Sequence, residues 1–418
     1  MESSTHEDRV QSQLFKLTRH YQAKTTSTLI PASQFPTDRQ LSYETTQQQL
    51  VHLLIDGDDE HRQNQQAGAW EKVFWRRIVN SIETGFADRR RDGDGEQVDD
   101  EEVHPSILEE MVKHLSASST STPSSRSRKW SWGPLLHRNR WKSVVTHEDG
   151  RIISAELGTP RESEGWARHE RPRLTNQINV LRKASIALSN HLIASPTLVS
   201  GATASTRVVE LGAGVGLVSL VAASLNPTIR VLSTDVNPDV LAQLELNVCD
   251  SESLTDGLVS VGQRAILTHA RSDVIDGLDD RIRVSSLDWE DMASSKRPLN
   301  GIWSDKDTGS LLILGADVVY DPTLASYLAA TLSVLLRPTP KDLPSNPAAS
   351  TTSRTTLIAG TIRNESTWEL FLTECTSRSL MIEPVDLLVP PEEGGIVGTE
   401  DWEGEVEVRL IKIVAKPL

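Results

Sequence analysis

Apolar residues recur at helical spacing in the first quarter of the chain. Leu14, Leu17 and Tyr21 are three and four residues apart, and similar spacings return within residues 50–54 and 70–82. Residues spaced in this way lie on one face of an amphipathic helix. The pattern therefore predicts a small N-terminal helical region over residues 1–115.

The next two segments differ from this region and from each other. Residues 116–129 are almost wholly Ser, Thr, Pro and Arg, a composition that buries too little apolar area to offset the entropy of ordering, so we expect a linker. Strand-like runs at 141–147 and 151–156 then flank Asp149-Gly150, a frequent turn sequence. They predict a β-hairpin region over residues 130–160, with its tryptophans as packing anchors.

Short apolar runs alternate with helical segments in the rest of the chain, which we assign to one domain over residues 165–418. Such alternation is typical of an α/β fold, in which a parallel sheet is covered by helices on both faces. The last run alternates apolar and polar residues, as an edge strand does. The expected strands are 207–211, 230–235, 282–287, 310–317, 356–361 and 406–414, and the expected helices are 184–193, 217–224, 238–248, 322–336 and 367–379.

Composition narrows the classes of function. The net charge of −15 disfavours nucleic acid as a partner, because it repels phosphate backbones. No segment approaches the roughly 18 unbroken apolar residues of a membrane span, and the N-terminus lacks the features of a secretory signal. The two cysteines, Cys249 and Cys375, cannot form a disulfide framework. A cytosolic or nuclear protein is expected.

A glycine-rich turn follows the first strand of the α/β domain. The sequence Glu210-Leu-Gly212-Ala213-Gly214-Val-Gly216 comes directly before a helix, where glycines let a ligand approach the backbone. The dinucleotide fingerprint requires a third glycine at the position of Leu217, and Glu210 would repel phosphates. The turn therefore favours a ligand that carries an amino group. The alternative is a tight turn without a ligand.

Acidic residues end the next two strands as well. Asp235 ends the second expected strand and can accept hydrogen bonds from ribose hydroxyls. Asp288 and Trp289 follow the third, where they offer an acceptor for an adenine amino group and a flat ring beside it. Each residue alone has a structural explanation, since Asp235 could cap a helix and Trp289 could lie in the core. The three strand ends together predict an adenosine-cofactor site.

The fourth strand ends in Ala316-Asp317-Val-Val-Tyr320. A carboxylate and a phenol at the same sheet edge can orient an amine nucleophile and stabilise its developing positive charge. The alternative is that Asp317 caps the next helix and Tyr320 packs. We expect no metal site, because the histidines show no pairing at metal-ligand spacing.

These motifs together resemble methyltransferase family 16, a group of seven-strand class I enzymes. The resemblance rests on residues 208–217, on Leu287-Asp-Trp and on Ala316-Asp-Val-Val-Tyr, and Asp-x-x-Tyr is the hallmark of the group. Residues 184–189 and 360–371 are further similar to the elongation factor 2 lysine methyltransferases. The resemblance implies a Rossmann-like doubly wound sheet with an antiparallel C-terminal edge strand.

The resemblance also implies a cofactor, S-adenosyl-L-methionine, and roles for the residues that match. Gly212, Ala213 and Gly214 would hold its methionine part, Asp235 the ribose, and Trp289 the adenine side, while Ala316 forms the wall near the sulfonium.

Asp317 and Tyr320 would act on the lysine of a protein substrate, with elongation factor 2 as the candidate, in a cytoplasmic and monomeric enzyme. One departure is Arg182, where the family usually has a tryptophan that contacts the cofactor. Two alternatives remain: methylation of an N-terminal amine or small molecule, and a degenerate methyltransferase fold that acts as a binding module.

Overall fold

The structure is a computed structural model that describes residues 2–25, 30–56, 69–92, 101–116, 126–134, 136, 140–148, 171–200, 206–249, 281–294, 310–337, 353–390, 394–397 and 407–416. The chain forms two compact units. The first comprises residues 1–143, 147–160 and 391–405, and the second comprises residues 144–146, 161–390 and 406–418. The short segment between the last two strands is therefore part of the N-terminal unit.

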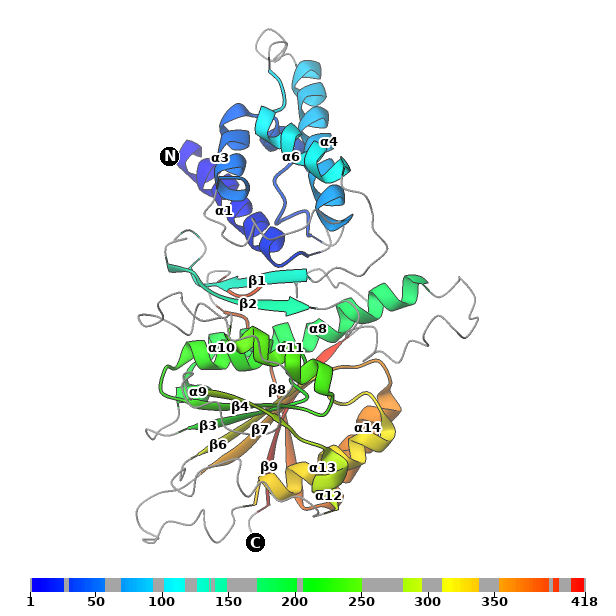
Figure 1. The fold of residues 1–418 in the computed structure, drawn as a ribbon. Helices are drawn as coiled ribbons and strands as arrows, with labels where there is room; N and C mark the ends of the chain where they lie inside the picture. The colour runs from blue at the N-terminus through cyan, green and yellow to red at the C-terminus, as the bar shows by residue number, and fades with distance from the viewer. Residues whose placement is uncertain are drawn as a thin grey trace. The chain divides into compact units, whose positions relative to one another are not determined.

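The N-terminal unit contains the helices that its apolar spacing predicts. Leu17, Phe74 and Ile78 are among the fully buried residues of its core. Its helices are α1 (Glu2–Gln22), α2 (Asp38–Leu41), α3 (Glu44–Leu54), α4 (Ala69–Arg91) and α6 (Pro105–Ser116) (Figure 1).

The hairpin region contains a strand pair that the sequence does not predict. Strand β2 (Lys142–Glu148) pairs with β1 (Arg126–Trp132), and the expected partner at 151–156 lies outside the described residues. Residues 126–129, which their composition assigns to a linker, begin β1. Trp130 and Trp132 are buried, as expected of packing anchors.

Arg19 ties three segments of the N-terminal unit together. This residue of α1 is only 1% exposed, and its guanidinium donates to the Gly395 carbonyl at 3.1 Å and to the Gly133 carbonyl at 2.7 Å. It also lies 4.2 Å from the ring centroid of Trp141. Gly133 N donates to the Gly394 carbonyl at 2.7 Å. The segment 394–397 is thus held by the hairpin and by α1.

The second unit is the predicted doubly wound α/β domain, built on a seven-stranded sheet in the order β5-β4-β3-β6-β7-β9-β8 (Figure 1). The strands are β3 (Arg207–Leu211), β4 (Arg230–Asp235), β5 (Ile282–Ser286), β6 (Leu311–Ala316), β7 (Arg354–Thr361), β8 (Leu380–Val385) and β9 (Val408–Ala415). The first five are parallel, and β9 runs antiparallel to β7. The antiparallel C-terminal strand is confirmed. It lies one place in from the edge, which β8 occupies.

Helices cover both faces of this sheet (Figure 1). One face carries α8 (Arg171–Ala194), α10 (Leu217–Leu225) and α11 (Pro238–Cys249), and the other carries α12 (Trp289–Ala293), α13 (Pro322–Leu335) and α14 (Glu365–Ser377); the short helix α9 (Thr197–Ser200) follows α8. Burial on both sides explains why β6 is a continuous apolar run and why every residue of β3 is buried.

Candidate active site

The order of the strands fixes where a ligand can bind. After β3 the chain adds β4 and β5 on one side, then returns to place β6 on the other side of β3. Ligands of doubly wound sheets bind at such a switch point, outside the carboxyl ends of the strands. Leu211 lies opposite Gly315 in the paired strands. The turn after β3 and the loop after β6 therefore meet at this point.

Glu210 is buried beneath the turn. Its Oε2 accepts a hydrogen bond from the backbone N–H of Ser219 at 2.9 Å and a second from the Ser219 hydroxyl. Gly216, the N-cap residue of α10, has no side chain to cap the helix, so Glu210 supplies an acceptor for its first turn. Burial raises the pKa of Glu210 to about 7, against the opposing effect of these hydrogen bonds.

Gly212, Gly214 and Gly216 of the turn all have left-handed backbone, and the first two differ in their surroundings. Gly212 has φ +61°, and a Cβ atom there would lie 2.9 Å from Val318 Cγ1. Gly214 has φ +54°, but a Cβ atom there would meet nothing within 4 Å. The backbone is therefore closely packed at Gly212 and open at Gly214. An open glycine backbone is what a ligand needs for close approach.

Asp235 closes the turn from the neighbouring strand. Its Oδ2 accepts from Gly214 N at 3.2 Å, and its Oδ1 accepts from Val236 N at 2.7 Å and Asn237 N at 3.1 Å. It does not cap α11 in the way that the structural alternative required, because Asn237 Oδ1 accepts from Asp239 N at the start of that helix. Asp235 is held at the edge of the site, beside the open backbone of Gly214.

Asp288 and Trp289 lie at the start of α12. Asp288 is the N-cap residue, and its Oδ1 accepts from Glu290 N at 2.8 Å. The half-buried ring of Trp289 packs against the core, and its Cζ2 lies 3.6 Å from the position that a Cβ of Gly212 would take. Trp289 therefore has a structural role and also lines the turn.

Asp317 has the most unusual environment of the site. It is 8% exposed, and its φ of +55° places a non-glycine residue in the left-handed region, which costs free energy and is concentrated at functional sites. Its Oδ1 accepts from Thr361 N at 2.8 Å, whereas no hydrogen-bond donor of the described residues reaches its buried Oδ2. Asp321, and not Asp317, caps α13.

Charged groups on two other elements act on Asp317. The guanidinium of Arg363, in the loop after β7, lies 3.7 Å from Oδ2. Burial raises the pKa of Asp317 to about 6, and the Thr361 hydrogen bond and Arg363 oppose this rise. Lys183 of α8 is buried, and desolvation lowers its pKa to about 8 although the Asp317 charge opposes that shift. At neutral pH the carboxylate is therefore mostly ionised.

Tyr320 and Ala316 flank Asp317. The side chain of Tyr320 is 57% exposed, three residues beyond Asp317 on the same loop, and Ala316 ends β6 beside Ala359. The structural alternative, in which Tyr320 packs in the core, does not hold. The phenol of Tyr320 is thus exposed, three residues along the chain from a buried carboxylate.

The structure thus brings the predicted residues Gly212, Asp235, Trp289 and Asp317 to one sheet edge. Sequence reasoning missed Lys183, Thr361 and Arg363. The chain order gives a signal for Arg363, which follows the carboxyl end of β7, whereas only tertiary packing brings Lys183 close. The side chain of Arg182 lies outside the described residues. Among the residues that the structure describes, no three acidic, histidine or cysteine side chains form a metal site.

Sequence comparisons agree with this geometry. Residues 179–265, which include β3, the glycine turn and β4, match the model of a family described as lysine methyltransferase. This part of the catalytic domain is therefore similar to the lysine methyltransferase family.

Several known proteins match longer parts of the chain. An uncharacterised protein of Dictyostelium discoideum is 23% identical over 292 residues, which cover 68% of each chain. The protein-lysine N-methyltransferase EFM3 of Chaetomium thermophilum is 26% identical over 332 residues, covering 71% of this chain and 85% of its own. Methyltransferase-like protein 22 of mouse is 30% identical over 162 residues, and the match spans 37% of this chain and 34% of the mouse protein.

The chain is therefore a methyltransferase, and S-adenosylmethionine is the methyl donor of such enzymes. The strand ends fit this cofactor in two respects. The open backbone at Gly214 leaves space for it, and Asp317 Oδ2, which accepts no hydrogen bond from the described residues, provides an acceptor close by. Among the described residues, no helix is both long and apolar enough to span a membrane.

Proposed function

We propose that this chain is a protein-lysine N-methyltransferase that uses S-adenosylmethionine. The buried carboxylate of Asp317 is the observation that carries the proposal. Its backbone is strained, and one of its oxygens accepts a hydrogen bond while the other has only the Arg363 guanidinium at 3.7 Å, which supports a role in binding a hydrogen-bond donor. The amine of a lysine is such a donor.

The cofactor would be held by the ends of β3, β4 and β5. Gly212, Ala213 and Gly214 would bind its methionine part through the backbone, with Gly216 completing the turn. Asp235 would accept from the ribose hydroxyls, Asp288 from the adenine amino group, and Trp289 would lie beside the adenine. Glu210 would support the amino group of the methionine part through its charge, since its Oε2 is already bonded to Ser219. Ala316 would line the region of the sulfonium.

The remaining side chains would act on the substrate. S-adenosylmethionine supplies an electrophilic methyl group when it is bound. Asp317 would accept a hydrogen bond from the uncharged lysine amine and stabilise the positive charge that develops on its nitrogen. Tyr320 would position the same amine from the exposed side, and Arg363 would help to keep Asp317 ionised through its charge.

The substrate that we propose is a translation elongation factor, with elongation factor 2 as the candidate. The similarity of residues 184–189 and 360–371 to the elongation factor 2 lysine methyltransferases supports this choice, and the relative that is named as a protein-lysine methyltransferase supports a protein substrate. The enzyme would act in the cytoplasm as a monomer.

The test is transfer of a radiolabelled methyl group from S-adenosylmethionine to the proteins of a cell extract. The wild type is compared with Asp317→Asn and with Glu369→Gln, which removes an exposed carboxylate on α14. One labelled band of the size of elongation factor 2, lost only in Asp317→Asn, supports the proposal. Labelling of small molecules alone, or no labelling by a protein that binds the cofactor in calorimetry, contradicts it.

A further inference from the structure

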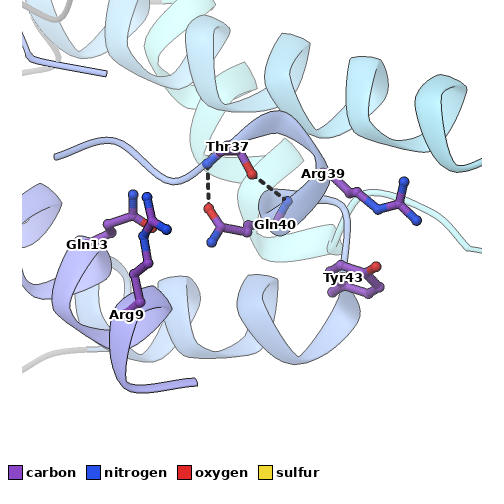
Figure 2. A pocket seen from close by; sticks show the side chains of 6 residues that line it. All are labelled: Arg9, Gln13, Thr37, Arg39, Gln40 and Tyr43. Carbon is purple, nitrogen blue, oxygen red and sulfur yellow. Dashed lines mark hydrogen bonds between the residues drawn. The ribbon is translucent and has the colours of Figure 1, made fainter. Parts of the chain in front are cut away.

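The polar pocket of the N-terminal unit is explained by the start of α2 (Figure 2). Its lining residues are Arg9, Gln13, Thr37, Arg39, Gln40 and Tyr43. Thr37 N donates to Gln40 Oε1 at 2.7 Å, and Gln40 N donates to Thr37 Oγ1 at 3.2 Å, which is a capping box. Arg39 pairs with Asp92. These contacts stabilise the helix, so we assign no ligand to the pocket.

A chain of three buried polar side chains leads instead to the glycine turn of the catalytic domain. Ser233 of β4 donates from its hydroxyl to Ser219 Oγ on α10, and the Ser219 hydroxyl donates to Glu210 Oε2 on β3. Ser219 and Ser233 are fully buried, and Glu210 is 2% exposed. Glu210 and Ser233 lie opposite each other in the paired strands. The chain therefore joins three elements beneath the turn.

The surroundings of this chain are mostly apolar. Apart from two serines, α10 consists of leucine, valine and alanine, and β6, on the other side of β3, contains no charged residue. The charged residues of the two remaining strands are Arg207 and Arg230 at their starts and Asp235, whose negative charge adds to the effect of burial in raising the pKa of Glu210. Hydroxyls are costly to bury in such surroundings unless they are hydrogen-bonded, and these two bond to each other and to the carboxylate.

The serines favour the charged form of Glu210. Burial raises the pKa of Glu210 to about 7, and the hydrogen bonds from Ser219 oppose this rise. A donor bonded to a carboxylate stabilises its ionised form, and a second hydroxyl that donates to the first strengthens this bond. The proposed cofactor site uses this negative charge, because the methionine part carries an ammonium group. In buried surroundings a charge acts over several ångströms, so the effect needs no direct contact.

We propose that Ser219 and Ser233 are positioning residues for the binding of S-adenosylmethionine. They hold the carboxylate of Glu210 beneath the turn and keep it ionised, so that affinity for the amino group of the cofactor depends on both hydroxyls. This inference rests on the cofactor site of the proposed function, and it adds a binding step that responds to pH. A purely structural role of the two serines would not make affinity for an amino group follow pH.

The test compares two ligands by calorimetry between pH 5.5 and 8. S-adenosylhomocysteine carries the amino group, whereas 5′-methylthioadenosine lacks the amino acid part and shares the adenosine. Any titration of Asp235, which would bind the ribose, therefore cancels in the ratio of the first affinity to the second. In the wild type this ratio is expected to rise with pH through about 7, by up to about 30-fold, the change in the ionised fraction of Glu210. The same series with Asp317→Asn removes the other carboxylate whose pKa, about 6, lies in this range.

The variants Ser219→Ala and Ser233→Ala identify the source of the pH dependence. Ser219→Ala removes a hydrogen bond to a charged group, so the rise should move to higher pH by about one unit. At pH 7.5 the ratio should then be about threefold below that of the wild type. Ser233→Ala acts through Ser219 and should give a smaller shift in the same direction. The matched control is Ser224→Ala on the same helix, whose hydroxyl donates to the Val221 carbonyl at 2.7 Å; the ratio should stay as in the wild type.

A ratio that does not change with pH in the wild type overturns the inference, and so does a rise at the same pH in Ser219→Ala and the wild type. An equal shift in Ser224→Ala overturns it as well, because the effect would then be a general one of altered α10. If the protein still binds both ligands and transfers methyl groups in these cases, the proposed function stands and the role of the serines fails. If neither ligand binds at any pH, both are overturned.

Discussion

At the scale of single residues, the ionisation of Asp317 should set the lower pH limit of activity. Its pKa is raised to about 6, chiefly by burial, and the ionised form accepts the substrate's hydrogen bond. The value of kcat/KM is therefore expected to rise with pH through about 6. Asp317→Asn should lower kcat by about 100-fold or more, the typical contribution of a positioned acid or base.

The control for this prediction is Glu369→Gln, which should keep the wild-type profile. A wild-type rate that is flat between pH 5 and 8, or an Asp317→Asn enzyme with near-normal kcat, would show that this carboxylate does not take part.

The raised pKa of Glu210 should make the free energy of unfolding depend on pH, independently of the pH dependence of activity. Its pKa in the folded protein, about 7, lies above the ordinary value of 4.5, so the folded state binds this proton more tightly than the unfolded state does. Its contribution to the free energy of unfolding is thus fully present below pH 4.5 and is lost as pH rises through 7. The loss is on the order of 3 kcal/mol.

Glu210→Gln keeps an oxygen that can accept from Ser219 but does not titrate. Urea unfolding at pH 5.5 and pH 8 should show that the variant loses less stability than the wild type over this interval. Equal losses in both proteins would mean that Glu210 is not desolvated as the structure indicates.

The residues of the site could be predicted to different degrees. Asp235 and Asp317 each lie at the end of an expected strand. Both were predicted at the sheet edge because the carboxyl ends of parallel strands lie together. The partners of Asp317 could not be read in this way. Lys183 comes from a helix far away in the sequence, and nothing in the motif around Asp317 indicates its positive φ.

At the scale of elements, alanine substitutions at Gly212 and Gly214 of the glycine turn are expected to have different effects. Alanine at either position has an unfavourable positive φ, which costs about 1–2 kcal/mol. Gly212→Ala also brings a methyl group to 2.9 Å from Val318, so it should destabilise the fold by more than Gly214→Ala does. Gly214→Ala places its methyl group in open space, so it should mainly weaken binding of the cofactor.

Chemical unfolding and calorimetry with S-adenosylhomocysteine distinguish these effects. Gly214→Ala is expected to lose affinity out of proportion to its loss of stability. Undiminished affinity in this variant would place the ligand elsewhere.

The elements of the α/β domain were largely predictable, with two informative exceptions. Strand β8 was not predicted; it contains Pro384, and the structure places this strand at the sheet edge, where proline is tolerated. The pairing of β2 with β1 was not predicted either, because β1 begins in a segment that looks like a linker. Both omissions arise where tertiary context outweighs local pattern.

At the scale of the whole molecule, Arg19 should be a main determinant of the stability of the N-terminal unit. Arg19→Met removes two hydrogen bonds and leaves the Gly133 and Gly395 carbonyls without these donors. The expected loss is about 2–4 kcal/mol, since these bonds are charge-assisted and largely buried. Hydrogen exchange should speed up in α1 and in residues 394–397, while β6 should keep its protection.

Arg76→Ala is the control, because it removes a charge of the same kind from an exposed site on α4. Unchanged exchange at residues 394–397 in Arg19→Met would show that other contacts hold this segment.

The place of residues 394–397 in the N-terminal unit has a consequence for synthesis. Gly394 bonds to Gly133 of the hairpin, and Gly395 bonds to Arg19 of α1, which leaves the ribosome 376 residues earlier. At about 5–20 residues per second, helix α1 waits on the order of 20–75 s for this partner. A chain that stalls inside the catalytic domain therefore releases an N-terminal unit that is still incomplete, and such a nascent chain is a natural client for chaperones.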